Sequence, residues 1–291
     1  MDRSKENELQ GWINGFIGVV IFSGSLPATK VAVLELEPIF ISVFRASVAG
    51  FLALFAVILL KVERPSKNQL GSLLIIVCAV IIGFPLLSAL ALQYISSAHS
   101  ILYIGVLPIA ATVFGILRGA DAPKPIFWLF SSLGAVLVIA YAVFYGESSS
   151  LKGDFLMFLS VLVCGLGYAE GTKLTKQMGG WQVISWALIL ALPVMLVCTY
   201  NYFPLNFKHI SINAGISLCY VSIFSMFIGF IFWYKGLAQG GIAFVGQLQL
   251  LQPFFGLILS ALLLQEKVNS SMIFVIIGVI LCVMGTKKFA K

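Results

Sequence analysis

The sequence predicts an all-α integral membrane protein with ten transmembrane helices, arranged as two inverted five-helix repeats. The chain has 291 residues, of which 60% are apolar or aromatic and 10% are charged, whereas a soluble globule has about 45–50% apolar and about 25% charged residues. Its apolar residues form unbroken runs of about twenty, such as 126–145, which is the length of a helix that spans the bilayer and twice that of a membrane strand. The second half of the chain also repeats features of the first. A cytosolic enzyme is therefore an unlikely class for this chain.

Hydropathy places the ten spans between short breaks that contain charges, prolines or glycines. Glu35, Glu37 and Pro38 separate the first two spans, and residues 118–125 separate the fourth from the fifth. Because the loops are short, consecutive helices should run antiparallel. The expected spans are 12–33, 39–60, 70–91, 98–118, 126–145, 153–173, 181–202, 211–234, 241–264 and 270–286.

The basic residues predict that both termini are cytoplasmic. With the amino terminus inside, the inner loops and tails carry thirteen Lys and Arg residues and the outer loops carry three, which is a strong positive-inside bias. Attraction to anionic headgroups explains the net charge of +7, so we expect the lipid bilayer and no nucleic acid as a partner. The first ten residues lack the short apolar core and cleavage site of a signal peptide, so we expect the first apolar run to be retained.

An internal repeat divides the chain into expected domains at 1–145 and 146–291. A shift of 142 residues places Leu9, Gly11 and Phe16 on Leu151, Gly153 and Phe158. A shift of 145 residues places Leu92, Ala98, Pro108 and Asp121 on Leu237, Ala243, Pro253 and Glu266. Five spans per half would turn the second half over in the membrane, as in the inverted repeats of secondary transporters. Chance matching between apolar sequences is the alternative explanation.

Two stretches carry a resemblance to a known family. GFPLLSALALQYISSAHSILYIGVLPIAATVFG and its counterpart FIGFIFWYKGLAQGGIAFVGQLQLLQPFFGLILSALLLQEKV resemble the EamA-type transporters of the drug/metabolite transporter superfamily. Tyr234, Ala238, Pro253 and Glu266 match the aromatic–alanine–proline–glutamate pattern of that family, and Pro108 matches its proline in the first half. The first half departs by having an aspartate as its acidic residue, and the first span contains FSGSLPATK without the usual tryptophan. The resemblance implies ten spans in two inverted halves, export of small metabolites or amino acids, and a bacterial inner membrane.

Lys30 and Arg45 are ionisable residues within the spans. A charge at the bilayer centre costs ~2.5–3.5 kcal/mol, so such a residue is a functional hypothesis by default. Arg45 lies about 9 Å below the outer end of the second span, where its planar fork would suit a substrate carboxylate or phosphate. A structural ion pair or helix-end carbonyls would satisfy it equally well. Lys30 lies within about a turn of the outer end of the first span, so it either binds substrate, snorkels, or pairs with Glu35 or Glu37.

Glu170 and His99 are candidates for coupling transport to protons. Glu170 lies near the cytoplasmic end of the sixth span, three residues before Lys173, so a local ion pair is the favoured alternative to a proton-carrying carboxylate. His99 opens the fourth span at the outer surface, and Tyr103 lies one turn further in on the same side. Both would line the outer part of a substrate pathway, where a histidine can titrate near neutral pH. An interfacial histidine without such a role is the alternative.

Amides and aromatic residues within the spans are further substrate-binding candidates. Gln249 and Gln252 lie three apart on one face of the ninth span and should face protein or a water-filled cavity. Helix-to-helix hydrogen bonding and substrate binding explain them equally well. Tyr168 and Trp186 lie deep in their spans, where they would either stack against an apolar or aromatic substrate or only pack.

Five prolines fall within the spans, at Pro27, Pro85, Pro108, Pro193 and Pro253. Each removes a backbone donor and frees a carbonyl, which gives either a static kink or a hinge. Pro108 and Pro253 are related by the repeat, so they are the favoured gating hinges.

A secondary transporter that works by alternating access is the function these features favour, with a small-molecule solute as its partner. An intramembrane enzyme is disfavoured because no G-x-S-x-G or H-E-x-x-H motif occurs, and because Asp2, Asp121 and Asp154 are expected in loops or a tail. A passive channel usually needs a polar ring, and the polar residues here are scattered. No nucleotide-binding loop is present and the five cysteines resemble packing residues, so we expect no cofactor or metal, and a solute gradient or a coupled proton as the driving force. A homodimer is compatible with the sequence.

Overall fold

The computed structural model describes residues 3–145, 150–204 and 210–265, and near the end of the chain residues 274, 275, 277, 278, 280–282, 284 and 285; at 3–5, 138 and 141–145 it describes the backbone alone. Every regular element in these described residues is helical. The first half contains α1 (Arg3–Ser23), α2 (Ser25–Val33), α3 (Pro38–Leu59), α4 (Lys67–Ile76), η1 (Val77–Gly83), α5 (Phe84–Ala91), α6 (Ser97–Tyr103), η2 (Ile104–Val106), α7 (Leu107–Leu117) and α8 (Pro125–Tyr145). The second half contains α9 (Leu151–Met178), α10 (Gly180–Asn201), α11 (Ile212–Tyr220), η3 (Val221–Ile228), α12 (Gly229–Gly240), α13 (Ile242–Val245), η4 (Gly246–Leu251) and α14 (Gln252–Leu264).

Eight helices or series of helices in the described residues are long and apolar enough to cross a membrane. They coincide with the predicted first four spans and with the predicted sixth to ninth, which confirms an all-helical membrane architecture. The helix α8, 21 residues long, occupies the position of the predicted fifth span. The predicted tenth span, 270–286, lies largely outside the described residues, so ten spans stay a prediction.

Prolines lie where helical segments of different geometry meet. Pro85, Pro108 and Pro253 are each the second residue of an α-helix, and each of these helices follows a π-helical or 3₁₀ segment. The first turn of a helix tolerates proline because its N–H would have no intrahelical acceptor there. Pro27 lies in the first turn of α2, whereas Pro193 lies inside α10, which continues unbroken through it.

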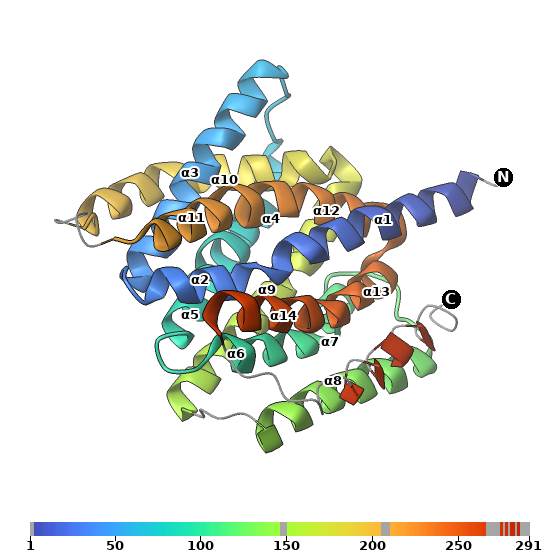
Figure 1. Ribbon diagram of the computed structural model, residues 1–291. Coiled ribbons are helices and arrows are strands. Elements are labelled where there is room, and N and C mark those ends of the chain that lie inside the picture. The colour runs from blue at the N-terminus through green and yellow to red at the C-terminus, as the bar shows by residue number, and fades with distance from the viewer. Residues whose placement is uncertain are drawn as a thin grey trace.

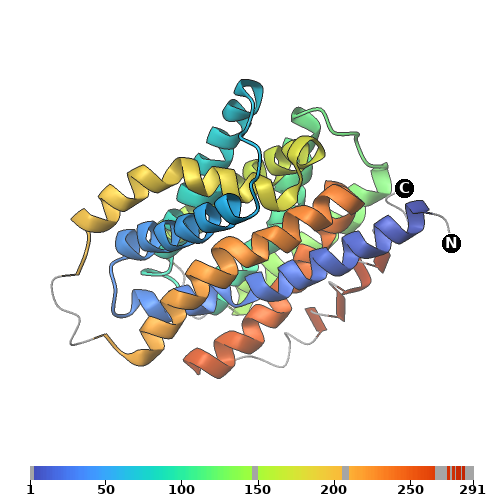
Figure 2. The same ribbon diagram turned by 90° about the horizontal axis from the view of Figure 1, so that it is seen from above.

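The spans pack lengthwise as a bundle. Figures 1 and 2 show α1 and α12 side by side, and α3 and α10 form another extensive contact. The helix α9 packs against both α5 and α7, and α8 lies at the edge of the bundle beside α6 and α7 (Figure 1). A Cβ added at Gly236 of α12 would lie 2.6 Å from the backbone nitrogen of Gly15 in α1, so a glycine is what lets these two backbones approach so closely.

Special segments recur at corresponding places in the two halves. The third and eighth spans both contain a π-helix, η1 and η3, and the fourth and ninth both contain a 3₁₀ segment followed by a proline-bearing helix, α7 and α14. π-helical turns within α-helices are rare and occur often at functional sites. Their matched positions direct attention to the region where these four spans meet.

Candidate functional site

A central cavity lies where the interrupted spans converge. Its lining residues come from α1, α2, α3, η1, α5, η2, α7, α9, η3, α12 and α14. Seven of the eight candidate spans therefore contribute, and α10 is the one that supplies no lining residue. Three predicted site residues, Arg45, Tyr168 and Gln252, line this single cavity.

Arg45 supplies the positive charge of the central cavity. It lies on α3 about two turns from the first residue of that helix, and 2% of its surface is exposed. Its Nη2 donates a hydrogen bond to Ser225 Oγ over 3.1 Å, and the Ser225 hydroxyl donates to Ser25 Oγ over 2.9 Å. The Arg45 Nε has no hydrogen-bond partner among the described residues. A guanidinium N–H is therefore available for an acceptor that the described protein does not supply.

The remaining wall of the cavity is largely aromatic and apolar. Tyr168 is buried on α9, with its ring centroid 6.0 Å from that of Phe230 and 5.3 Å from that of Trp233. The rings of Phe22 and Phe230 lie 4.8 Å apart. Gln252 donates from Nε2 to the Phe22 carbonyl over 3.3 Å. The cavity thus offers one cation, two hydroxyls, a phenol and an amide within an aromatic enclosure.

Other predicted residues lie next to the cavity or away from it. Pro108 and Pro253 directly follow the lining residues Leu107 and Gln252, so both candidate hinges adjoin the cavity. Gln249 is buried in η4 and is not among the residues that line the cavity. Trp186 is half-buried on α10, outside the set that lines the cavity.

Lys30 caps the carboxyl-terminal end of the neighbouring helix α5 and is not among the residues that line the cavity. Its Nζ donates to the carbonyls of Leu92 over 2.6 Å and Ile95 over 3.3 Å, just beyond the last turn of α5. A cation there complements the unpaired carbonyls of a helix end. Of the acids predicted as its partners, Glu35 instead accepts hydrogen bonds of 2.6 Å from both the backbone nitrogen and the hydroxyl of Ser211. These bonds hold the pKa of Glu35 below its ordinary value.

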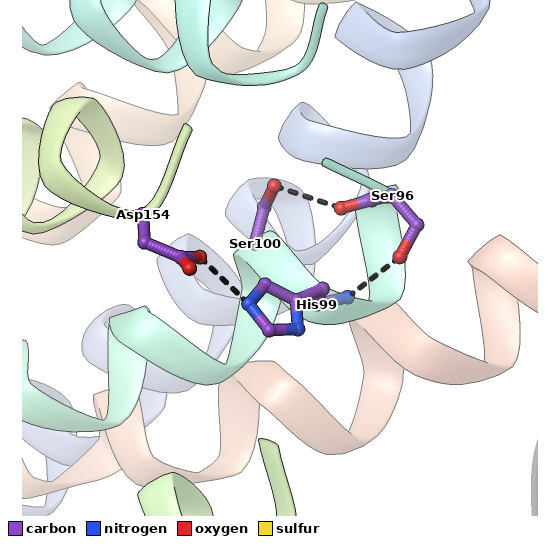
Figure 3. Close-up of polar contacts among 4 residues, drawn as sticks. All are labelled: Ser96, His99, Ser100 and Asp154. Carbon is purple, nitrogen blue, oxygen red and sulfur yellow. Dashed lines mark hydrogen bonds and ion pairs between the residues drawn. The ribbon is translucent and has the colours of Figure 1, made fainter. Parts of the chain in front are cut away.

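His99 forms a partly buried contact with a residue that the sequence placed in a loop. Asp154 lies in the first turn of α9, which corrects that expectation, and its Oδ1 lies 2.8 Å from His99 Nε2. Figure 3 shows the imidazole pointing from α6 toward this carboxylate. The backbone nitrogen of His99 donates to Ser96 Oγ over 3.1 Å, which caps α6, and the Tyr103 ring lies 5.8 Å from the imidazole. His99 is 6% exposed, so its side chain is buried between helices, and it lies in the first turn of α6, where the fourth span begins.

The contact between α6 and α9 has a counterpart at the other end of the bundle. The shifts that align the two halves, 145 and 142 residues, carry His99 to Phe244 and Trp12 to Asp154. Trp12 and Phe244 pack edge to face with ring centroids 5.2 Å apart. In Figure 1, α13 and α1 meet at one end of the molecule, whereas α6 lies at the other. One end is therefore joined by a histidine–carboxylate pair and the other by an aromatic pair.

Glu170 pairs with Arg118 and not with Lys173, which corrects the predicted local ion pair. The Arg118 Nε donates to Glu170 Oε2 and the Ser72 hydroxyl donates to Oε1, both over 2.5 Å. Glu170 is 0% exposed, and the Arg118 side chain is 36% exposed. The hydrogen bond to this carboxylate raises the pKa of Arg118 above its ordinary value. Lys173 lies beside the pair at a surface pocket of about 350 Å³, together with Lys176.

Eight helices or series of helices long and apolar enough to cross a membrane, packed around a largely apolar cavity, define an integral membrane protein. The sequence matches the EamA-like transporter family twice, over residues 9–145 and 151–286. The chain belongs to this family, which is part of the drug/metabolite transporter superfamily. The resemblance inferred from the sequence is thus confirmed, and a transporter is the class that the family indicates.

Named relatives agree with this class. The chain is 56% identical over 281 residues to the "Uncharacterized transporter YdeK" of Bacillus subtilis (strain 168), covering 97% of this chain and 98% of the relative. It is 22% identical to an "Uncharacterized transporter" of Archaeoglobus fulgidus, covering 92% of each. A solved structure titled "Crystal structure of protein" has the same fold, with a TM-score of 0.74 at 13% identity over 96% of this chain and 97% of that one.

Proposed function

We propose that this protein is a secondary transporter that moves a small organic solute across the membrane by alternating access, with the central cavity as its binding site. The observation that carries the proposal is that both halves of the chain contribute residues to the cavity wall. Phe22, Arg45 and Pro85 come from the first half of the chain, and Tyr168 and Gln252 come from the second. Movement of one half against the other would therefore open the cavity without unfolding either half.

The repeated contacts support an inverted arrangement of the two halves, with domains at 1–145 and 146–291. Besides the pair of end contacts already described, Lys152 donates to the Tyr94 hydroxyl over 2.7 Å, and Gln239 donates to Gln10 Oε1 over 3.2 Å. The shifts of 145 and 142 residues carry Tyr94 to Gln239 and Gln10 to Lys152. Two halves of opposite orientation would use such matched contacts to close one end or the other.

In this proposal, His99 and Asp154 bind the coupling proton. The imidazole meets the Asp154 carboxylate on α9 and the Tyr103 ring on its own helix, and an ion pair at the end of the bundle would strengthen when His99 is protonated. Glu170, already bound to Arg118 and Ser72, serves in this scheme to fasten α9 to its neighbours. In gating, Glu170 would keep its bonds to Arg118 and Ser72 while the helices bend at Pro108 and Pro253.

The cellular setting follows from the family and from the charge bias. The charge bias supports cytoplasmic termini, because thirteen basic residues fall in predicted inner loops and tails against three in outer ones. Membership of the EamA-like transporter family supports the two other parts of the proposal, a bacterial inner membrane and export as the direction. The cavity is built from one chain, so a homodimer is compatible with transport and not required by it.

Counterflow in liposomes tests the proposal. Purified full-length protein is reconstituted into vesicles loaded with an unlabelled solute, and entry of the same radiolabelled solute is followed without ATP across a panel of amino acids and small organic acids. We expect accumulation above protein-free vesicles for at least one solute class. A correctly folded preparation that exchanges none of them would refute transport as the function.

A further inference from the structure

The central cavity contains a buried positive charge that the described protein does not neutralise. The cavity-lining residues include Arg45 and neither aspartate nor glutamate. The hydrogen bond from Arg45 to Ser225 satisfies part of the guanidinium but supplies no opposite charge, and the Arg45 Nε has no partner among the described residues. An unpaired buried charge is costly in a membrane protein, so such a group usually marks the place where an opposite charge binds.

The donors at Arg45 favour a single carboxylate. A planar guanidinium donates parallel hydrogen bonds that match a carboxylate, and the hydroxyls of Ser225 and Ser25 extend the polar strip beside it. A phosphate dianion would bring two negative charges to a cavity wall with one cationic residue. The charge balance therefore favours a monoanion.

The other side chains of the cavity wall determine the rest of the ligand. Phe22, Phe84, Tyr168 and Phe230 line the cavity with aromatic rings, and Met226 adds an apolar side chain. Such a wall would bury an apolar or aromatic body favourably. An ammonium group would find no carboxylate among the lining residues, so a zwitterion would leave its cation poorly compensated.

We propose that the cavity binds small monocarboxylates with an apolar or aromatic body, that Arg45 pairs with the carboxylate, and that an α-ammonium group weakens binding. This inference rests on the proposed function, since it takes the central cavity to be the transport site. It favours organic acids over amino acids as ligands, a distinction that the family resemblance does not make.

Ligand binding to the purified full-length protein tests the inference without any substitution. The probes are 3-phenylpropanoate, its neutral isostere 3-phenylpropanamide, L-phenylalanine and inorganic phosphate, measured by calorimetry and by ligand-induced thermal shift. We expect the carboxylate to bind about 10- to 100-fold more tightly than the amide, because only the carboxylate brings the negative charge that neutralises the buried guanidinium. L-phenylalanine and phosphate should also bind more weakly. Equal affinity for the acid and the amide, or tighter binding of either of the other two probes, would overturn the proposal.

Matched variants locate the site. Arg45→Gln and Arg45→Lys should each weaken 3-phenylpropanoate binding by about 10-fold or more, because neither retains the charged fork. Arg64→Gln makes the same change at an exposed residue and should leave the affinity unchanged. Unchanged affinity in a folded Arg45→Gln protein would overturn the assignment of Arg45.

Transport of the same probes separates this inference from the proposed function. If 3-phenylpropanoate binds but does not exchange across liposomes, the carboxylate site stands and the transport proposal falls. If the protein exchanges L-phenylalanine or another solute but does not bind 3-phenylpropanoate, transport stands and the monocarboxylate proposal falls.

Discussion

Replacement of Arg118 by glutamine should destabilise the protein more than the same replacement at Lys173. The buried Glu170 carboxylate is hydrogen-bonded to Arg118 and Ser72. Arg118→Gln therefore leaves a fully buried carboxylate without its charged partner. Breaking a fully buried ion pair costs about 3–5 kcal/mol. Because the Arg118 side chain is 36% exposed, water compensates part of this loss, and we expect about 1–2 kcal/mol.

Thermal unfolding at one fixed scan rate in the same detergent measures the difference. A cost of 1 kcal/mol lowers Tm by about 2–4 °C in a domain of 150–250 residues, so Arg118→Gln should lower Tm by about 2–8 °C. Lys173→Gln removes a positive charge next to the same carboxylate, without an ion pair to Glu170 among the described residues, and should change Tm by less than about 1 °C. A larger decrease for Lys173→Gln than for Arg118→Gln would refute the pairing and restore the local ion pair predicted from the sequence.

Three further perturbations have defined outcomes. His99→Gln should remove the coupling of transport to an imposed proton gradient, because the imidazole is the group that binds the coupling proton in the proposal; coupling equal to that of the unmodified protein would count against that role. Glu35→Gln should lower Tm at neutral pH but not at acid pH, because a depressed pKa stabilises the fold above the ordinary pKa and this contribution is lost as the pH falls through the folded-state value. A Tm difference that persists in acid would contradict the bonds from Ser211. Gly236→Ala should cost about 1–3 kcal/mol because its Cβ would meet backbone atoms of α1, whereas Gly71→Ala, with no atom within 4 Å of the new Cβ, should be neutral or stabilising in the same unfolding assay.

The sequence predicted the spans well because each one is a local property of about twenty consecutive residues. It also singled out Arg45, Tyr168 and Gln252, because a charged, phenolic or amide side chain is conspicuous in an apolar run. Their convergence on one cavity depends on which helices pack together, and nothing in the local sequence specifies that.

The polar partners that the sequence did not reveal fall into two kinds. Ser25 and Ser225 are common residues, and serines within helices often bond their own helix, as Ser222 does with the Leu218 carbonyl, so their presence carries no signal. Asp154 and Arg118 were assigned to loops, although each lies within or next to a helix end where it meets a titratable residue from a distant span. Comparing the depths of residues in the fourth and sixth spans along the membrane normal would have placed His99 level with Asp154 and Arg118 level with Glu170. That comparison was the signal that could have paired them.

The sequence predicts some of the helix interruptions and not others. Proline predicts a disturbance at Pro85, Pro108 and Pro253, and the structure has one before each. The π-helical segment η3 contains no proline, and Pro193 causes no break in α10. Tertiary packing therefore decides which spans are interrupted, and the matched interruptions around the cavity were apparent only in three dimensions.

Cross-linking at the two ends of the bundle tests alternating access most directly. Cysteines replace Trp12 and Phe244 in one protein and His99 and Asp154 in another, in a background without the native cysteines, and each pair is joined by a short cleavable thiol cross-linker before counterflow is measured in liposomes. If the two ends open alternately, either cross-link alone stops exchange, and cleavage restores it wherever the uncross-linked variant is active. Exchange that continues with either end covalently closed would contradict alternating access.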